Sequence, residues 1–203
     1  MIFANGFSKV AFVPVFGDID CQAALIGNVF NHPIICKEQR MNSRDAIKNS
    51  IQTADMVCGA YLENLSDENL MQRPHPDCNH VNWQIGHLIS SDFNMANGCI
   101  PGLLPELPTG FAEKYTKETT GNDDPAAFCS KEELMSINQA QRAAVLAKLD
   151  ELSESDLAQP APEEMRSYAP TVGAALNMLG GHWMMHAGQW VIVRRNLGRE
   201  IVI

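Results

Sequence analysis

The 203-residue sequence lacks three features that would place it in common classes of protein. No run of apolar residues approaches the length that spans a bilayer, and the N-terminus has neither the basic region nor the cleavage site of a secretory signal. The six cysteines are scattered without a C-x-x-C pair, which argues against a zinc ribbon or a compact disulfide framework. We therefore expect a cytoplasmic protein whose cysteines are reduced and mostly buried.

Basic residues are also in short supply. The chain has 15 Lys and Arg against 24 Asp and Glu, for a net charge of −9. The first forty residues are balanced in charge, so the whole acidic excess lies in residues 41–203. Nucleic acids and anionic membranes bind basic patches, so we expect neither as a partner. The hydrophobic content of 45% is sufficient for a sizeable core.

The chain changes character at about residue 41. The segment "KVAFVPVFGDI" in the first forty residues alternates apolar and turn residues like a strand or an extended segment, and "NVFNHPIICKEQRM" has no helical period. From Asn42 onward, apolar residues recur at helical spacing. We predict an N-terminal extension over residues 1–41, disordered or strand-like, and a helical domain over residues 42–203.

Four amphipathic helices are predicted in that domain. They cover residues 42–65, 80–99, 130–152 and 171–198. Ser43 is the expected N-cap of the first helix and Thr171 that of the last, while Ser130 and Glu133 have the spacing of a capping box. Without a convincing strand pattern among them, these elements predict an all-α four-helix bundle.

The connection over residues 99–129 is rich in proline and glycine and longer than most connections between helices. It lies between the second and third predicted helices, where it could cover a pocket. Phe111 and Tyr115 would anchor such a lid. Simple packing of the segment on the surface is the alternative.

His182 and His186 stand one turn apart on the same apolar row of the last predicted helix. Two imidazoles at this spacing can bind one metal ion, although they can equally be core side chains that hydrogen-bond to neighbours. A third ligand would be required. His75 and His80 lie in or beside a proline-rich connector and are expected to be solvated, whereas His87 lies on the polar inner row of the second helix. The three together would form a site with an open coordination position, as in catalytic metal centres.

Two other metal sites are excluded by the residues themselves. The protease signature H-E-x-x-H requires Glu after the first histidine, and Trp183 occupies that position. A carboxylate-bridged di-iron bundle requires Glu-x-x-His pairs on facing helices, and the sequence has none. The available ligands therefore suit one ion.

The segments "NWQIGHLI" and "GGHWMMHAGQWVIVRRNLGR" resemble the DinB/YfiT-like superfamily of bacterial metalloproteins. The mark of that family is a histidine on the second helix together with H-x-x-x-H followed by G-Q on the last. The resemblance covers about residues 42–199, with the "LPTGFAEKY" loop and the capping-box helix in the expected order, and the first forty residues match nothing in the pattern.

The resemblance implies a helical bundle, commonly a homodimer, that binds zinc, nickel or another divalent ion through His87, His182 and His186. It also implies a transferase that uses a low-molecular-weight thiol, acting on an electrophilic small molecule in detoxification or stress response. A metal-dependent hydrolase on the same three histidines is the second hypothesis. The third is a non-catalytic bundle that binds metal or a partner.

Other residues of the two histidine-bearing segments have weaker assignments. Gln189 could hold a histidine or a water in place at the edge of the site. Asp92 is a weak candidate for a proton carrier, because helical geometry turns it about 140° away from His87. This shortage of carboxylates favours thiol transfer over hydrolysis. Gly180, Gly181 and Gly188 suggest a close approach of another backbone or a dimer contact.

Overall fold

The computed structural model describes residues 41–200, so the predicted extension, except for Met41, lies outside the described residues. These residues contain four long helices, α1 (Ser43–Leu62), α3 (Val81–Cys99), α4 (Lys131–Glu151) and α6 (Val172–Asn196). The shorter elements are α2 (Asp67–Leu70), α5 (Glu154–Leu157), η1 (Ala112–Tyr115), η2 (Lys117–Thr119), η3 (Pro125–Ala127) and η4 (Glu163–Met165). Within residues 41–200 there is no strand, and the predicted four-helix bundle is confirmed.

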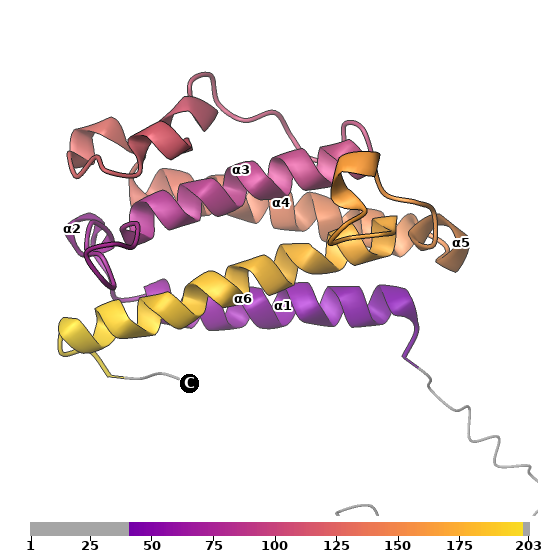
Figure 1. Cartoon of the computed structure of the whole chain (residues 1–203). Coiled ribbons are helices and arrows are strands. Elements are labelled where there is room, and N and C mark those ends of the chain that lie inside the picture. The colour runs from indigo at the N-terminus through magenta and orange to yellow at the C-terminus, as the bar shows by residue number, and fades with distance from the viewer. Residues whose placement is uncertain (1–40, 201–203) are drawn as a thin grey trace, which may run out of the picture. The chain divides into compact units, whose positions relative to one another are not determined.

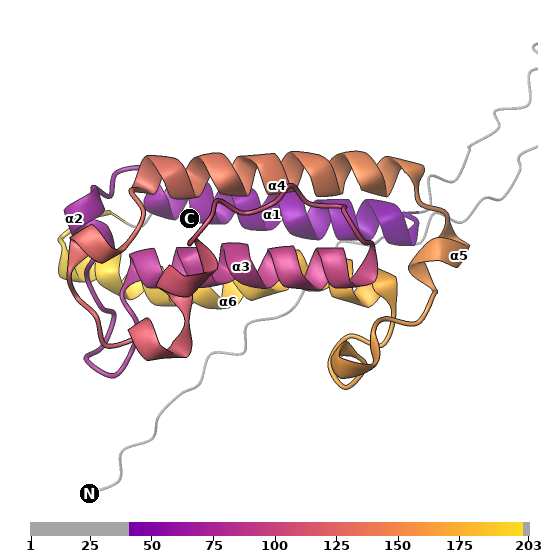
Figure 2. The ribbon, with the colours of Figure 1, turned by 90° about the horizontal axis from the view of Figure 1, so that it is seen from above.

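The four long helices occupy the corners of a square in cross-section (Figures 1 and 2). α1 and α3 each pack against both α4 and α6. α1 therefore lies diagonally opposite α3 in the bundle, and α4 lies diagonally opposite α6. α3 and α4 run in the same direction, and the connection between them returns along the bundle (Figure 2). α6 runs antiparallel to α3, which places its histidines beside the first half of α3.

Local sequence signals fix the ends of these helices. The Ser130 hydroxyl and the Glu133 carboxylate form the predicted capping box of α4, and the Thr171 side chain caps α6. The prediction for α1 is wrong by one residue, because the Asn42 side chain accepts from the Asp45 amide and Ser43 is already helical. Asn and Ser are both good caps, so the pattern alone did not decide between neighbours.

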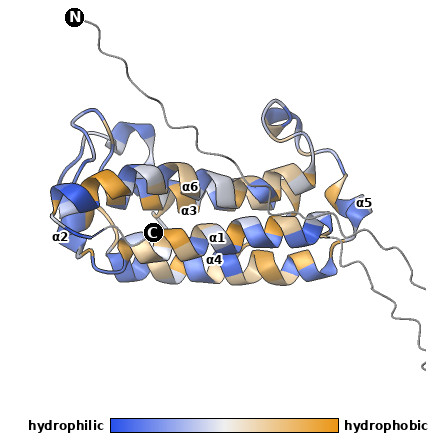
Figure 3. Ribbon diagram, turned by 90° about the horizontal axis from the view of Figure 1, so that it is seen from below, coloured by the Kyte–Doolittle hydropathy of each residue, from blue (hydrophilic) through white to orange (hydrophobic). Residues whose placement is uncertain are grey.

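Apolar and polar residues alternate along each long helix, as expected for a bundle whose helices are half-buried (Figure 3). The buried residues form two clusters, one toward each end of the bundle. Among the described cysteines, Cys58 is buried while Cys78, Cys99 and Cys129 are only partly buried, and all four are free thiols. No helix in residues 41–200 is both long enough and apolar enough to cross a membrane.

Glycines allow two close approaches in the bundle. A Cβ on Gly180 would lie 2.6 Å from the Ser50 carbonyl oxygen, so this glycine lets α6 pack tightly on α1. A Cβ on Gly86 would lie 2.2 Å from the Tyr115 ring, so Gly86 lets η1 pack on α3. In contrast, Gly181 and Gly188 have open space where a Cβ would lie, and neither explains a close approach within the described chain.

The connection between α3 and α4 is held against the bundle by its aromatic residues. Phe111 and Tyr115 are buried, and their rings lie 4.9 Å apart between centroids. The Tyr115 hydroxyl accepts from the Cys129 amide at 3.0 Å, which ties the middle of the connection to its C-terminal end. η1 is therefore fixed over α3, immediately next to His87 in the fold.

Candidate metal centre

Three histidines from two helices converge at the α3–α6 contact. His87 comes from α3, and His182 and His186 come from successive turns of α6; one ligand atom from each lies within 4.8 Å of the other two. Nitrogens around one tetrahedral ion are about 3.4 Å apart, so small rotations of the rings would let them share an ion. Within residues 41–200 this is the one group of His, Cys, Asp or Glu side chains with the geometry of a metal site.

All three imidazoles are held in the neutral form that metal ions require. Burial lowers the pKa of His87, and burial together with the neighbouring His87 lowers the pKa of His182. Burial, and then the other two histidines, lower the pKa of His186 to about 4. A neutral imidazole keeps a lone pair on one ring nitrogen, so at neutral pH the cluster offers three nitrogen ligands.

Gln84 fixes the orientation of His186. The Trp190 indole Nε1 donates to the Gln84 side chain at 2.9 Å, and because an indole N–H can only donate, the accepting atom is the amide oxygen. The same oxygen lies 2.9 Å from His186 Nδ1. Nδ1 must therefore carry the proton of the neutral ring, which leaves the lone pair on Nε2 for a metal.

The Gln84 amide is itself held in place. Its nitrogen donates to the Asn79 carbonyl at 2.7 Å and to the Gln189 side-chain oxygen at 3.1 Å. Gln189 thus hydrogen-bonds to Gln84, the residue that holds His186, so it supports the site through Gln84. Sequence analysis overlooked Gln84, although a glutamine one turn before His87 on a buried helix face was a signal that could have revealed it.

An aromatic side chain orients His87. Trp83 stacks on the imidazole with 5.1 Å between ring centroids and 8° between ring planes. The Trp83 indole donates to the Thr119 hydroxyl at 2.9 Å, which links this ring to the connection between α3 and α4. His80, predicted to be solvated, is instead fully buried, where its Nδ1 accepts from the Trp83 amide and caps α3. The prediction failed because a histidine can act as an N-cap.

Asp92 lies away from the histidines, in the core of the bundle. Its carboxylate accepts from the Trp183 indole at 2.8 Å and pairs with Arg142 at 3.0 Å. Burial raises the pKa of Asp92, and the Arg142 guanidinium opposes that rise. Asp92 is therefore bound within the core and is not placed to carry protons at the histidine cluster.

A cavity of about 410 Å³ opens beside His87. Its floor is the face of α3 that bears His87, and its walls come from η1 and from the segment around η4. The lining residues are His87, Ser90, Ser91, Asn94, Met95, Ala112, Tyr115, Thr116, Met165 and Tyr168. A small molecule in this cavity would contact His87, the one histidine of the cluster that lines it.

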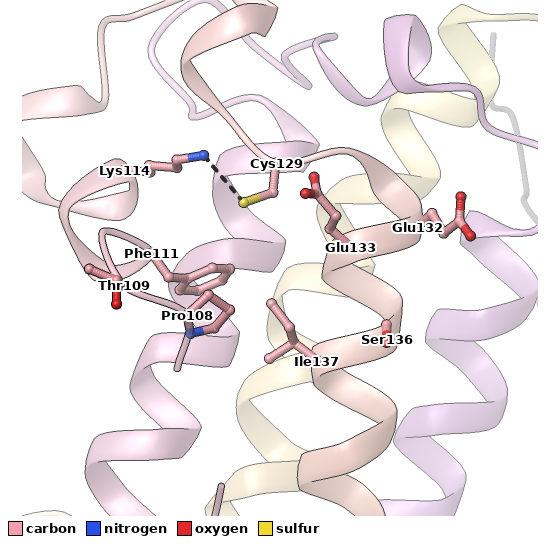
Figure 4. A pocket seen from close by; sticks show the side chains of 9 residues that line it. All are labelled: Pro108, Thr109, Phe111, Lys114, Cys129, Glu132, Glu133, Ser136 and Ile137. Carbon is pink, nitrogen blue, oxygen red and sulfur yellow. Dashed lines mark hydrogen bonds between the residues drawn. The ribbon is translucent and has the colours of Figure 1, made fainter. Parts of the chain in front are cut away.

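A second cavity, of about 530 Å³, lies on the other side of η1 and contains none of the three histidines (Figure 4). Lys114 and Cys129 point toward each other across it, with the ammonium nitrogen 3.7 Å from the sulfur (Figure 4). Glu132 and Glu133 also line it. The two cavities share η1 as a common wall but differ in charge.

Comparison with known proteins identifies the family. The model described as the DinB superfamily matches residues 52–190, which is more than half of the chain. The protein therefore belongs to the DinB superfamily, and the resemblance noted in the sequence is confirmed. No curated protein matches the chain.

Two solved structures share the fold. One is a conserved protein from Enterococcus faecalis, 18% identical, with a TM-score of 0.56; the match covers 79% of this chain and 100% of the other. The other is YfiT from Bacillus subtilis, described as a probable metal-dependent hydrolase with an unusual four-helix bundle topology. YfiT is 18% identical, with a TM-score of 0.53 and coverage of 86% of this chain and 97% of its own. At this identity the likeness establishes the fold.

Proposed function

We propose that His87, His182 and His186 bind one divalent metal ion and that the protein is a metal-dependent enzyme acting on a small molecule. The observation that carries this proposal is the convergence of three neutral imidazoles from α3 and α6, with one tautomer fixed by Gln84. Histidines that serve only packing have no need to bring one ligand nitrogen each within 4.8 Å of the others.

The donor set suits zinc or nickel. Three imidazole nitrogens are borderline-soft ligands of the kind these ions accept, and hard oxygen ligands for magnesium or calcium are missing from the described cluster. A bound divalent ion would supply Lewis acidity, which lowers the pKa of a water or a thiol in its open coordination position.

The residues around the cluster favour thiol transfer. Hydrolysis calls for a general base, and the described lining of the cavity at His87 contains no carboxylate. Attack by a thiolate needs no such base, because the sulfur is already deprotonated. The carbon–sulfur bond forms as the leaving group departs with its electron pair, and the proton of the thiol passes to solvent.

A metal-dependent hydrolase on the same site is the second candidate. It is supported by the description of the structural neighbour YfiT as a probable metal-dependent hydrolase. In that case the chain's own part would be to hold His186 through Gln84 and to admit substrate through the cavity at His87, while a water molecule acts as nucleophile.

Metal analysis and a thiol-dependence assay test the proposal. Protein purified without a nickel column is expected to contain about one equivalent of zinc or nickel, and His182→Ala should lose it. His75→Ala is the matched control, because His75 is exposed in a connector and outside the cluster. Metal in both variants, or in neither the variants nor the wild type, contradicts the proposed site.

Turnover separates the candidate functions. The metal-loaded protein is incubated with haloaromatic and epoxide electrophiles with and without a small thiol, and with p-nitrophenyl esters. Thiol-dependent turnover that disappears on chelation supports the transferase, and thiol-independent ester cleavage supports the hydrolase. Full metal occupancy with neither activity would favour a non-catalytic metal-binding bundle.

A further inference from the structure

The cavity beside His87 is continuous with one face of α3. His87, Ser91 and Asn94 lie four and three residues apart, so their side chains follow one another along this face and all line the cavity. His87 also belongs to the histidine cluster. His87 is thus the one residue of the cluster that also lines the cavity, so a molecule in the cavity lies next to a metal-ligating side chain.

The described lining of this cavity has no charged side chain. Apart from His87, its polar groups are hydroxyls and one amide, from Ser90, Ser91, Asn94, Thr116 and Tyr168, whereas the Tyr115 hydroxyl is already bonded to Asn82 and the Cys129 amide. The Ser90 hydroxyl oxygen is buried and has no hydrogen-bond partner within the described chain. Buried hydroxyls normally have a hydrogen-bond partner, so a ligand with its own hydroxyl or carbonyl groups would supply the partner that the Ser90 hydroxyl lacks.

The apolar part of the lining complements these groups. Met95, Met165, Ala112 and the Tyr115 ring contribute apolar surface. At about 410 Å³ the cavity has the size of an ordinary small-molecule site. Its mixture of hydroxyl groups and apolar surface suits a ligand that is polar and uncharged.

Electrostatics disfavours an anionic ligand body. A carboxylate or phosphate in this cavity would meet no Lys or Arg among the lining residues, and the chain as a whole carries −9. The second cavity differs in this respect, because charged side chains line it, namely Lys114, Glu132 and Glu133. At the histidine cluster the sole positive charge would be the ion, which takes one donor atom and not the body of the molecule.

We propose that the cavity at His87 binds the body of the metal-ligating substrate and selects an uncharged, hydroxyl-bearing molecule over one that carries carboxylates. This inference rests on the proposed function, since it requires an ion at the three histidines. Asn94 is the specificity-determining residue, because it is exposed within the cavity and lies two turns from His87.

The cobalt-substituted full chain provides a binding readout that does not depend on activity. A thiolate bound to Co²⁺ gives a near-ultraviolet charge-transfer band, and the probes are thioglycerol, which is uncharged with two hydroxyls, and 3-mercaptopropionate, a carboxylate of similar size. Each is titrated into wild type, Asn94→Lys and Asn49→Lys. Asn49 is the matched control, because it is exposed on α1, diagonal to α3.

Wild type should bind thioglycerol at least about fivefold more tightly than 3-mercaptopropionate. Asn94→Lys should improve binding of 3-mercaptopropionate by about threefold to fivefold, as expected for one solvent-accessible ion pair, so that the preference for thioglycerol narrows or disappears. Asn49→Lys should change the affinity for neither probe.

Failure of the metal site and failure of the proposed selectivity give different results. If no cobalt visible spectrum forms and His182→Ala behaves like wild type, the proposed function is overturned and this inference falls with it. If cobalt binds but wild type prefers the carboxylate, or Asn94→Lys acts no differently from Asn49→Lys, the metal site stands and the assigned selectivity is wrong.

Discussion

The bundle contains two polar clusters that meet at neighbouring residues of α6 but have opposite characters. His182 belongs to the cluster of three histidines, while the next residue, Trp183, hydrogen-bonds to Asp92 in a charged cluster with Arg142. In the charged cluster the Arg142 guanidinium is fully engaged, because it pairs with Asp92 and Asp55 and donates to the Leu179 carbonyl, and only Asp92 Oδ1 has no partner in the described residues.

The histidine cluster, by contrast, is open toward the cavity at His87. Within residues 41–200 the polar support of its rings is the bond from His186 to Gln84, and one ligand atom of each histidine lies within 4.8 Å of the other two. Polar groups that satisfy one another hold a fold together, whereas polar groups that converge without partners are ready for a ligand. We therefore interpret the charged cluster as structural and propose the histidine cluster as the ligand site.

The largest expected effect concerns the charged cluster. Arg142→Leu leaves the buried Asp92 carboxylate without its cation and should lower the free energy of unfolding by about 3–5 kcal/mol, measured by urea denaturation. Metal content of the folded variant should stay at the wild-type value. The double variant Arg142→Leu/Asp92→Leu should recover most of the loss, and a single variant within about 1 kcal/mol of wild type would contradict the structural role.

The second prediction concerns support of the histidine cluster. Gln84→Leu removes the acceptor from His186 Nδ1 and from Trp190 and should weaken zinc binding about 10- to 100-fold, measured by competition with a chelator. Gln84→Glu keeps an acceptor for both donors and should lose less affinity. Equal losses in the two variants, or none in Gln84→Leu, would show that the bond to His186 does not position a ligand.

The third prediction concerns the wall shared by the two cavities. In Gly86→Ala the new methyl group would lie 2.2 Å from the Tyr115 ring, so the ring and η1 must move. We expect a loss of stability of about 1–3 kcal/mol and weaker probe binding in the cavity at His87. Gly188→Ala has open space and should be neutral or more stable by up to about 1 kcal/mol. Thermal melts of both variants and of wild type measure these changes in stability.

The last prediction is a pH dependence. The pKa of His186 is lowered to about 4 in the folded protein, below its ordinary value of 6.5. Between these values the unfolded chain binds more protons, so this histidine's contribution to stability is complete above pH 6.5 and is lost as the pH falls toward 4. Metal-free wild type should therefore lose more stability than metal-free His186→Asn between pH 7 and about pH 4.5 in thermal melts. If stability falls equally with pH in the two proteins, the pKa of His186 is not lowered by folding.

Sequence reasoning succeeded where the signal was local. The capping box at Ser130 and the cap at Thr171 depend on residues within one turn, and both are confirmed. It failed at the start of α1, where Asn42 and Ser43 are both suitable N-caps. It also failed for His80, whose burial depends on segments distant in sequence. Gln84 was missed because its partners, His186 and Trp190, are about a hundred residues away in sequence.

The sequence by itself determined the four amphipathic helices and the placement of His182 and His186 on one face, because helical periodicity depends only on residues a few positions apart. Only the tertiary structure decided that His87 meets this pair, that Gln84 fixes the His186 tautomer, and that Asp92 turns into the core. The physical reason is that contacts between α3 and α6 depend on how the whole bundle packs, which no short stretch of sequence records.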